Sequence, residues 1–376
     1  MLRVALLLIV GLFVAVPSSV RAQPPGVKTL SIGASAPDFK LPGVDDKVYT
    51  LKDFADAKLL LVVFTCNHCP TANAYEKRII DLHTDYKAKG VALVAISPND
   101  PKAVRLDELG YTDLGDSFED MKLRAKEQKF TFPYLYDGDT QEASRAFGVM
   151  ATPQVFLFDQ ERKLRYQGRI DDADVKPVTS HDTRNALDAL LAGKPVPVET
   201  TRVFGCSTKW SDKRADAVKS LEKWDMEPVK LEPLDEAGVA KLVKNEGKKL
   251  LLINVWATHC GPCVAELPEF VTMNRMYRRR NFELITISID DPAKRGEALK
   301  VLQEKKVAAT NYISTVEKAD KFADLLDKDW QGPLPYTLLI SPEGKIIYRK
   351  TGAIEPLTVR RQVVDFLGRT YASKAK

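Results

Sequence analysis

The two halves of the chain carry the same succession of apolar runs. Residues 59–64 (LLLVVF) and 250–255 (LLLINV) form runs of strand length, and each is preceded by a lysine. Runs of this kind are typical of strands buried inside a domain. Each run leads within a few residues to two cysteines separated by two other residues. The pattern therefore predicts a buried strand followed by a cysteine pair in each half.

The repetition continues further along both halves. A second strand is predicted at 91–96 and at 282–287, and a proline then opens a hairpin at 153–166 and at 335–348. Strand, helix, strand and hairpin is an α/β order. We predict one domain at 28–195 and a second at 231–376, joined by a linker at 196–230 that follows the extended sequence KPVP.

The first 22 residues read as a targeting signal. Arg3 precedes an apolar run at 4–16, and small residues lie before Gln23. This order predicts a secretory signal peptide at 1–22, because a run of that length is shorter than the roughly 20 residues that span a bilayer. An uncleaved anchor is the alternative. We expect a periplasmic or secreted protein without a membrane span after cleavage, in a compartment where disulfides can form.

Composition excludes several other classes. The chain has 376 residues, a formal charge of +5, 44% hydrophobic residues and 28% charged residues, which is ordinary for globular protein. The sequence contains no basic face with interleaved aromatic residues, so nucleic acid is not an expected partner. Five cysteines are too few for a scaffold held together by disulfides, so their positions matter more than their number.

The second cysteine pair, Cys260 and Cys263, suits reversible disulfide chemistry. Two intervening residues at the start of a helix bring two sulfurs into bonding range. The positive end of that helix and the neighbouring imidazole of His259 favour a Cys260 thiolate. Half of a zinc site is the alternative, but with four histidines and no third such pair the chain lacks ligands to complete it. We expect no metal and no cofactor.

The second half resembles the thioredoxin fold and, more closely, the TlpA-type thiol–disulfide oxidoreductases. The resemblance lies in residues 256–263 (WATHCGPC), which begin with Trp256, and in residues 334–337 (LPYT). The resemblance implies that Cys260 is the nucleophile and Cys263 the resolving thiol. It also implies that Glu266 moves protons at the second sulfur, although a solvated helix residue is the alternative.

Pro335 matches the cis-proline of that family. A cis bond there would present the backbone of Leu334 to a substrate. The alternative is a trans proline that opens a strand.

The first pair lies in residues 64–71 (FTCNHCPT), with Thr152 and Pro153 downstream. This half resembles the peroxiredoxin-like, AhpC/TSA-type redoxin branch of the same fold. Aligning the two leucine runs without gaps places Cys69 on Cys260 and His68 on His259, with Pro at the first helical position. We therefore hypothesise that Cys69 is the thiolate and Cys66 its partner, the reverse of the thioredoxin order.

Hydroperoxide reduction fits this motif poorly. Peroxiredoxins carry a threonine three residues before the reactive cysteine, and that position here is Cys66, while Thr65 lies one residue too far away. They also use an arginine, for which Arg145 and Arg169 are the candidates.

Cys206 lies alone after the first domain. An odd cysteine in an exported protein suggests a reactive thiol or a pairing partner, so Cys206 is a candidate to resolve a sulfenic acid on Cys69, or a disulfide with Cys66, by exchange. The alternative is a small buried hydrophobic residue.

We therefore predict two tandem thioredoxin-like domains, each an α/β/α three-layer sandwich, in an exported thiol–disulfide oxidoreductase. Each pair must be held close together and must be open to an incoming protein. The Gly261-Pro262 match to thioredoxin favours reduction of protein disulfides. The family implies a membrane-embedded thiol electron donor, and two tethered centres allow an internal relay. The alternatives are a thiol peroxidase and a Cu(I) carrier that uses Cys66, His68 and Cys69.

Overall fold

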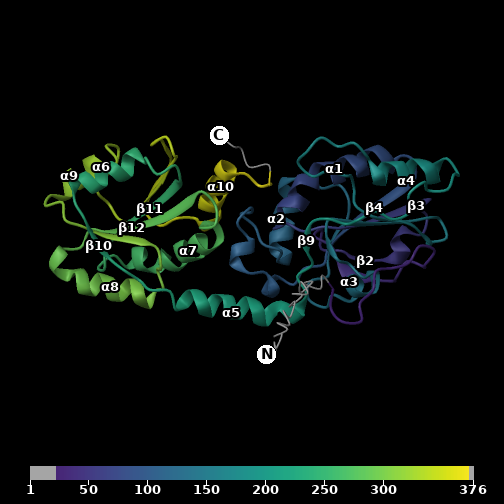
Figure 1. The fold of residues 1–376 in the computed structure, drawn as a ribbon, viewed down its shortest axis with the longest axis horizontal. Helices are drawn as coiled ribbons and strands as arrows, with labels where there is room; N and C mark the ends of the chain where they lie inside the picture. The colour runs from purple at the N-terminus through teal and green to yellow at the C-terminus, as the bar shows by residue number, and fades with distance from the viewer. Residues whose placement is uncertain (1–22, 372–376) are drawn as a thin grey trace, which may run out of the picture.

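The computed structural model describes residues 23–371, so the predicted signal peptide at 1–22 lies outside the described residues. Figure 1 shows two α/β units side by side, with helix α5 (Arg214–Asp225) running beneath them from one to the other. Within the described range, no helix combines the length and apolar character needed to cross a membrane.

The first unit is built on a five-stranded sheet in the order β5-β4-β3-β7-β8. The first three strands of this sheet in the chain run parallel, and β7 and β8 form an antiparallel hairpin. The strands are β3 (Leu59–Phe64), β4 (Val91–Ser97), β5 (Tyr134–Tyr136), β7 (Gln154–Phe158) and β8 (Leu164–Gly168). Two-stranded ribbons are formed by β1 (Lys40–Pro42) with β2 (Val48–Thr50), and by β6 (Ala151–Thr152) with β9 (Cys206–Ser207).

Both faces of this sheet are covered, which explains why every residue of β3 is buried. Alternate β3 residues pack into two separate cores because side chains alternate across a strand. The helices of this unit are α1 (Pro70–Lys87), α2 (Phe118–Glu127), α3 (Glu142–Phe147) and α4 (Asp182–Leu191). The first, second and fourth pack on one face, while α3 and the N-terminal ribbon pack on the other.

The second unit repeats this plan with one more strand at the edge. Its sheet has the order β10-β13-β12-β11-β14-β15, with β14 antiparallel to the central β11. The strands are β10 (Glu232–Leu234), β11 (Leu250–Trp256), β12 (Phe282–Ser288), β13 (Thr310–Ser314), β14 (Tyr336–Ile340) and β15 (Ile346–Thr351).

Helices again cover both faces. They are α6 (Glu236–Lys244), α7 (Gly261–Tyr277), α8 (Arg295–Glu304), α9 (Ala319–Leu326) and α10 (Pro356–Leu367). Helices α7 and α10 pack on one face, and α6 and α9 on the other. The predicted fold class, two tandem thioredoxin-like α/β/α domains, is confirmed, as are both predicted hairpins. The region predicted as a linker contains β9 and α5.

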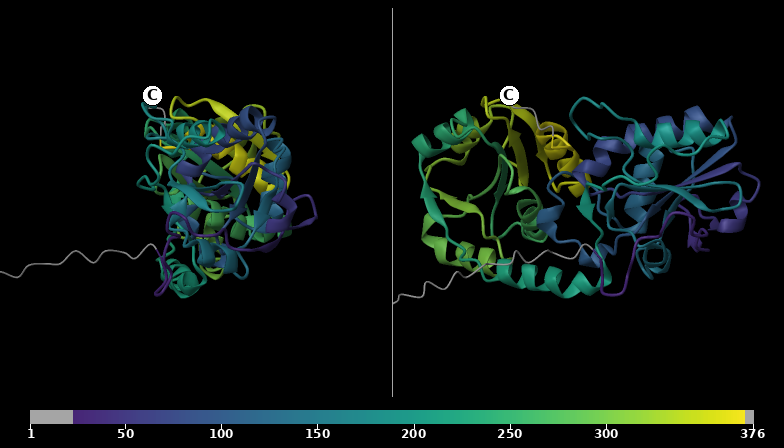
Figure 2. Two further views of the ribbon diagram at one scale, coloured as in Figure 1. Left: turned by 90° about the vertical axis from the view of Figure 1, so that its right-hand side faces the viewer. Right: turned by 45° about the vertical axis from the view of Figure 1, so that its right-hand side comes forward.

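The two units contact each other through the C-terminal end of α7. The Tyr277 hydroxyl donates a hydrogen bond to the Thr112 carbonyl oxygen at 2.9 Å, and the Arg280 guanidinium lies 4.0 Å from the centre of the Tyr111 ring. Asp113, buried in the first unit, pairs with Arg361 and Arg369 of the second. In both views of Figure 2, α5 stays at the lower edge of the molecule, so it bridges the units without entering either sheet.

Candidate active site

The first cysteine pair lies where β3 gives way to α1. Cys69 caps α1, and the Ala72 amide donates to its Sγ at 3.4 Å. Pro70 occupies the first helical position, which has no amide to satisfy. Unpaired amides at a helix N-terminus stabilise negative charge, so this is a position that favours a thiolate.

A loop 83 residues away in sequence completes the pair's surroundings. The Thr152–Pro153 bond is cis. The Thr152 hydroxyl lies 3.1 Å from the Cys66 Sγ, and the Thr152 carbonyl oxygen lies 3.4 Å from the Cys69 Sγ. The two cysteines of the first pair therefore lie against the residues that open the proline-led strand.

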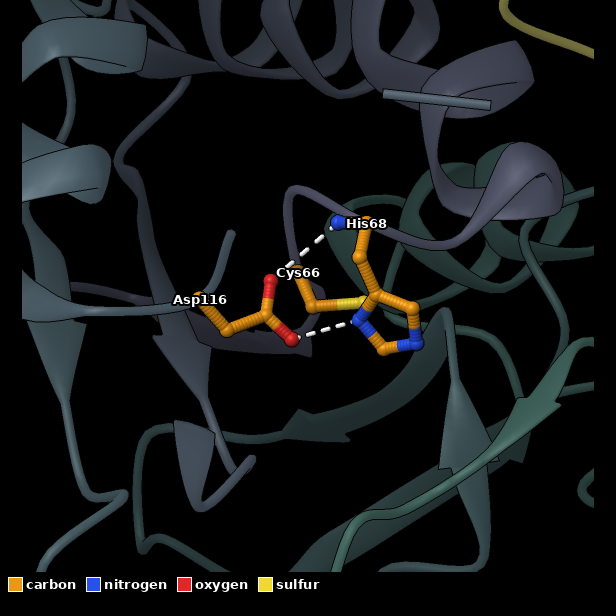
Figure 3. A group of neighbouring side chains, drawn as sticks. All are labelled: Cys66, His68 and Asp116. Carbon is orange, nitrogen blue, oxygen red and sulfur yellow. Dashed lines mark hydrogen bonds and ion pairs between the residues drawn. The ribbon is translucent and has the colours of Figure 1, made fainter. Parts of the chain in front are cut away.

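A buried imidazole and carboxylate stand beside the thiols. The His68 Nδ1 lies 2.5 Å from the Asp116 Oδ2 (Figure 3). The other carboxylate oxygen accepts the backbone amides of Asn67 and His68 at 2.9 and 3.1 Å, and the Asn99 side-chain amide donates to Oδ2 at 2.7 Å. Burial lowers the pKa of His68, but the charge and hydrogen bond of Asp116 outweigh it, so the pKa is raised and the imidazolium is favoured.

The two thiols have opposite acidities. Burial works against ionisation of Cys69, but hydrogen bonds from Cys206 and Cys66, the His68 charge and the Ala72 amide together hold its pKa well below the usual range. Burial, the hydrogen bond to Cys69 and the negative charge of Asp116 raise the pKa of Cys66 well above its usual range. In the reduced state, these surroundings favour a thiolate at Cys69 and a protonated thiol at Cys66.

Cys66, His68 and Asp116 also have the residue types of a metal site, and their ligand atoms lie within 4.8 Å of one another. In Figure 3 the carboxylate points at the histidine rather than at the sulfur. Four hydrogen bonds already use both oxygens of Asp116. The arrangement suits an oriented imidazolium better than a cation, which would have to displace these donors.

Access to the first pair is closed. Cys66 is 5% exposed and Cys69 is 0% exposed, whereas the sequence suggests that both pairs are open to an incoming protein. The closing element is β9, in which Cys206 pairs with Thr152 in antiparallel register. Cys206 is only partly buried, and it packs against Cys66 and Cys69. Three thiols therefore meet at this centre.

The second pair lies at the N-terminus of α7 and is a disulfide. Cys260 caps the helix, its Cα lies 5.3 Å from the Cα of Cys263, and the Cys263 amide points at the Cys260 Sγ over 3.3 Å. Cys260 is half-buried, while Cys263 is sealed among Trp256, Leu267 and their neighbours. One sulfur therefore faces outward and the other inward, as the family resemblance implies.

Glu266 lies in the second turn of α7, three residues after Cys263, and is 7% exposed, so it is not a solvated helix residue. Its carboxylate accepts the Asn254 side-chain amide and the Ile354 backbone amide, both at 3.0 Å. Burial raises the pKa of Glu266, and this effect outweighs the two hydrogen bonds, which lower it. A carboxyl group with a raised pKa can hold a proton nearer neutrality and exchange it with a sulfur.

The edge beside the second disulfide is open. The Leu334–Pro335 bond is cis, and Leu334 is half-buried with no strand paired to it among the described residues. A hollow of about 400 Å³ begins close by and includes Gly332, Trp330 and Phe322. His259 is exposed, with its Nδ1 3.6 Å from the Asp290 Oδ1 at the rim of the same hollow.

Some sequence candidates lie elsewhere. Arg145 stacks on Trp210, and Arg169 pairs with Asp182 at 2.7 Å, so both are engaged away from the thiols. The sequence patterns did not single out Asp116. The nearest signal is that an aspartate just ahead of a helix lies between two predicted strands, and this pattern is too common to single it out.

Known proteins resemble the chain in part. It is 27% identical over 113 residues to the thiol-disulfide oxidoreductase ResA of Bacillus subtilis, covering 28% of this chain and 55% of that relative. It is 33% identical over 124 residues to the ResA of Oceanobacillus iheyensis, covering 33% and 59%. The chain thus spans less than two thirds of these relatives. A crystal structure of a hypothetical protein from Sinorhizobium meliloti matches 49% of this chain and 97% of its own, at 36% identity and a TM-score of 0.44.

The family model describes a larger part of the chain. Two separate regions, residues 32–167 and 226–349, match the AhpC/TSA family, one in each α/β unit and together more than half of the sequence. Each match includes a cysteine motif and the central strand that leads to it. The chain is a member of the AhpC/TSA family in which the domain occurs twice.

Proposed function

We propose that this protein is an exported thiol–disulfide oxidoreductase with two dithiol centres, of which the second acts on protein disulfides. The observation that carries the proposal is the Cys260–Cys263 disulfide at a helix N-terminus, beside the open edge at Leu334. An extended substrate can pair with that backbone while the adjoining hollow receives its side chains.

The chemistry at the second centre is dithiol exchange. The reduced Cys260 thiolate, stabilised by the end of α7, attacks a substrate disulfide and forms a mixed disulfide. Cys263 then attacks the Cys260 Sγ, the substrate leaves as a thiol, and the internal disulfide is formed. Glu266 takes the proton from Cys263 in this second step, which its burial and raised pKa support.

The first centre uses Cys69 as its nucleophile, Cys66 as its partner and Cys206 as a resolving thiol. The opposite pKa shifts of Cys69 and Cys66 support this order. Thr152, Pro153 and His68 position the pair, as Trp256, His259 and Pro335 do at the second centre.

A second candidate activity is reduction of small hydroperoxides by Cys69. The buried, charged sulfur favours it, because a small oxidant can enter where a protein cannot. Against it stands Cys66 at the position where peroxiredoxins have threonine.

An internal relay would send electrons from Cys260 and Cys263 to the first centre. The contact between the units uses the C-terminal end of α7, and the dithiol lies at the other end of this 17-residue helix, about 25 Å away. The relay therefore requires domain rearrangement or exchange between two molecules. A membrane-embedded thiol donor would reduce the Cys260–Cys263 disulfide again after each turnover. Such a donor fits the signal peptide proposed at 1–22.

Insulin reduction by the dithiothreitol-reduced protein tests the proposal. We expect turnover with the full chain and none with Cys260→Ser, while peroxide consumption should respond only to Cys69→Ser. A full chain that neither reduces insulin nor cycles its Cys260–Cys263 disulfide would refute the oxidoreductase function.

A further inference from the structure

The edge at which a thioredoxin-like domain would pair with a substrate is already occupied in the first unit. Strand β9 runs antiparallel to β6, with Cys206 opposite Thr152 and Ser207 opposite Ala151. The Thr208 amide extends the ladder by donating to the Met150 carbonyl oxygen at 3.2 Å. The equivalent edge at Leu334 carries no strand in the described chain.

This pairing is built into the sequence on both sides of Cys206. Gly205 has φ +150°, and a Cβ at this residue would lie 2.1 Å from the Thr152 carbonyl oxygen, so only glycine permits the approach. Phe204 packs its ring against Tyr75, with 6.0 Å between the centroids. On the far side, the Lys209 amide donates to the Asn99 Oδ1 at 2.8 Å.

The second unit adds a cover over the same thiol. Tyr371, which follows α10, is 54% exposed and lies near the Cys206 and Cys69 sulfurs, and its ring lies 5.2 Å from the Tyr111 ring. Cys206 is nevertheless only partly buried, while the two thiols beneath it are 5% and 0% exposed. Of the three sulfurs, Cys206 is the one nearest to solvent.

We propose that β9 is a tethered substrate strand, so that Cys206, and no outside protein, exchanges directly with Cys69. This rests on the proposed function of the first centre. Strand β9 keeps protein disulfides away from Cys69. The partner that this centre accepts is a thiolate that can reach Cys206.

The exchange conserves atoms and electrons. When Cys66 and Cys69 are oxidised to a disulfide, the Cys206 Sγ attacks the Cys69 Sγ; the Cys66–Cys69 bond breaks, and Cys66 leaves with the electron pair and takes up the proton lost by Cys206. An incoming thiolate then attacks the Cys206 Sγ, and Cys69 leaves as the thiolate with the lower pKa. A second incoming thiol frees Cys206, so two external thiols become one disulfide as the centre is reduced.

The first test displaces β9 without altering any thiol of this centre. In a Cys260→Ser, Cys263→Ser background reduced with dithiothreitol, Gly205→Val is compared with Gly193→Ala, a glycine at φ +67° with open space around it. We expect Gly205→Val to raise the rate at which a bulky maleimide labels Cys69 by about tenfold or more, and the control to leave it unchanged. Equal labelling in a folded Gly205→Val protein and its parent would overturn the proposal.

Insulin reduction by the same variants distinguishes the shielding role of β9 from the proposed function of the first centre. A gain of insulin reduction in Gly205→Val supports both the shielding role of β9 and the proposed function of the first centre. Faster labelling without insulin reduction keeps the shielding role and refutes that function for this centre.

The second test does not depend on Gly205→Val folding. In Cys66→Ser, diamide takes two electrons and two protons from the remaining thiols, and peptide mapping should find Cys69 joined to Cys206. Cys66→Ser combined with Cys206→Ser is the control in which this product cannot form. If diamide left Cys69 and Cys206 unpaired in Cys66→Ser, the tethered strand would be refuted.

Discussion

The two dithiol centres share a strand, a helix N-terminus and a cis-proline, yet they differ in what can reach them. Cys69 is 0% exposed beneath β9, whereas Cys260 is half-buried beside a backbone edge to which no described strand is paired. The fold supplies the same reactive position twice. The comparison teaches that access to the sulfur, rather than the fold around it, is what differs between the two cysteine pairs, and the proposed function assigns them different partners on this ground.

The centres also differ in how charge is supplied. The His68 imidazole is buried and held by Asp116, so a positive charge is fixed beside the Cys69 sulfur. The corresponding His259 side chain is 77% exposed, and solvent screens its effect on Cys260. The buried centre therefore depends on one ion pair, while the open centre depends mainly on the end of α7.

The largest expected effect comes from removing the exposed nucleophile. Cys260→Ser should lower the rate of insulin reduction by about 100-fold or more, because the sulfur that attacks the substrate is lost. Cys69→Ser, the matched change at the buried centre, should alter that rate by less than about twofold, since no protein reaches it. Turbidity of precipitating insulin measures both rates, and similar losses in the two variants would break the distinction between the centres.

The next effect concerns the carboxyl group at the open centre. Glu266→Gln should slow resolution of the mixed disulfide by about 10- to 100-fold, because the proton of Cys263 loses its acceptor. Burial raises the pKa of Glu266, so the wild-type rate should climb as pH rises through that raised value, and the variant should lose this climb. Glu269→Gln, on the same helix but with a 43% exposed side chain, is the control. Stopped-flow measurements across pH give both profiles.

A smaller effect is expected at the buried imidazole. His68→Gln should raise the pKa of Cys69 by about one unit, a tenfold change in the thiolate equilibrium, because the imidazolium charge that favours the thiolate is lost. Folding lowers the pKa of Cys69, so its thiolate persists as pH falls and is lost only when pH passes through the lowered value. The stability that this ionisation contributes is present above the unfolded pKa and is lost over the same fall in pH. Thiolate absorbance at 240 nm against pH measures the shift; an unchanged curve in His68→Gln would show that the hydrogen bonds suffice.

The smallest effect is expected at the cover over Cys206. Tyr371→Ala should speed alkylation of Cys206 by about threefold, since the phenol near the sulfur is removed while β9 stays in place. Tyr111→Phe keeps the ring and serves as the control. Peptide mass spectrometry after a brief exposure to iodoacetamide gives the rate, and slower labelling in Tyr371→Ala would contradict the covering role.

Much of the architecture could be predicted because it repeats locally. The buried run before each cysteine pair, the proline after it and Pro70 at the first turn are patterns of adjacent residues, and each lies where the sequence suggested. Glu266 could be singled out because family resemblance marks its position.

The closure of the first centre could not be predicted, because it depends on contacts between distant segments. Asp116 meets a histidine 48 residues away, and Tyr371 meets Cys206 across the unit boundary. Neither residue stands out in its own neighbourhood. Cys206 was noticed as an odd thiol, but its pairing with Thr152 follows from the path of the chain after β8, which apolar periodicity does not encode.

The ion pairs of Asp113 affect how readily the two units separate from each other. Its carboxylate is 2% exposed in one unit, and both arginines that neutralise it belong to the other. Pulling the units away from each other would break both ion pairs together with the hydrogen bond between Tyr277 and Thr112, so separation costs free energy. Heat or denaturant should therefore melt both halves in one transition, and either half expressed alone should be less stable than it is within the whole chain.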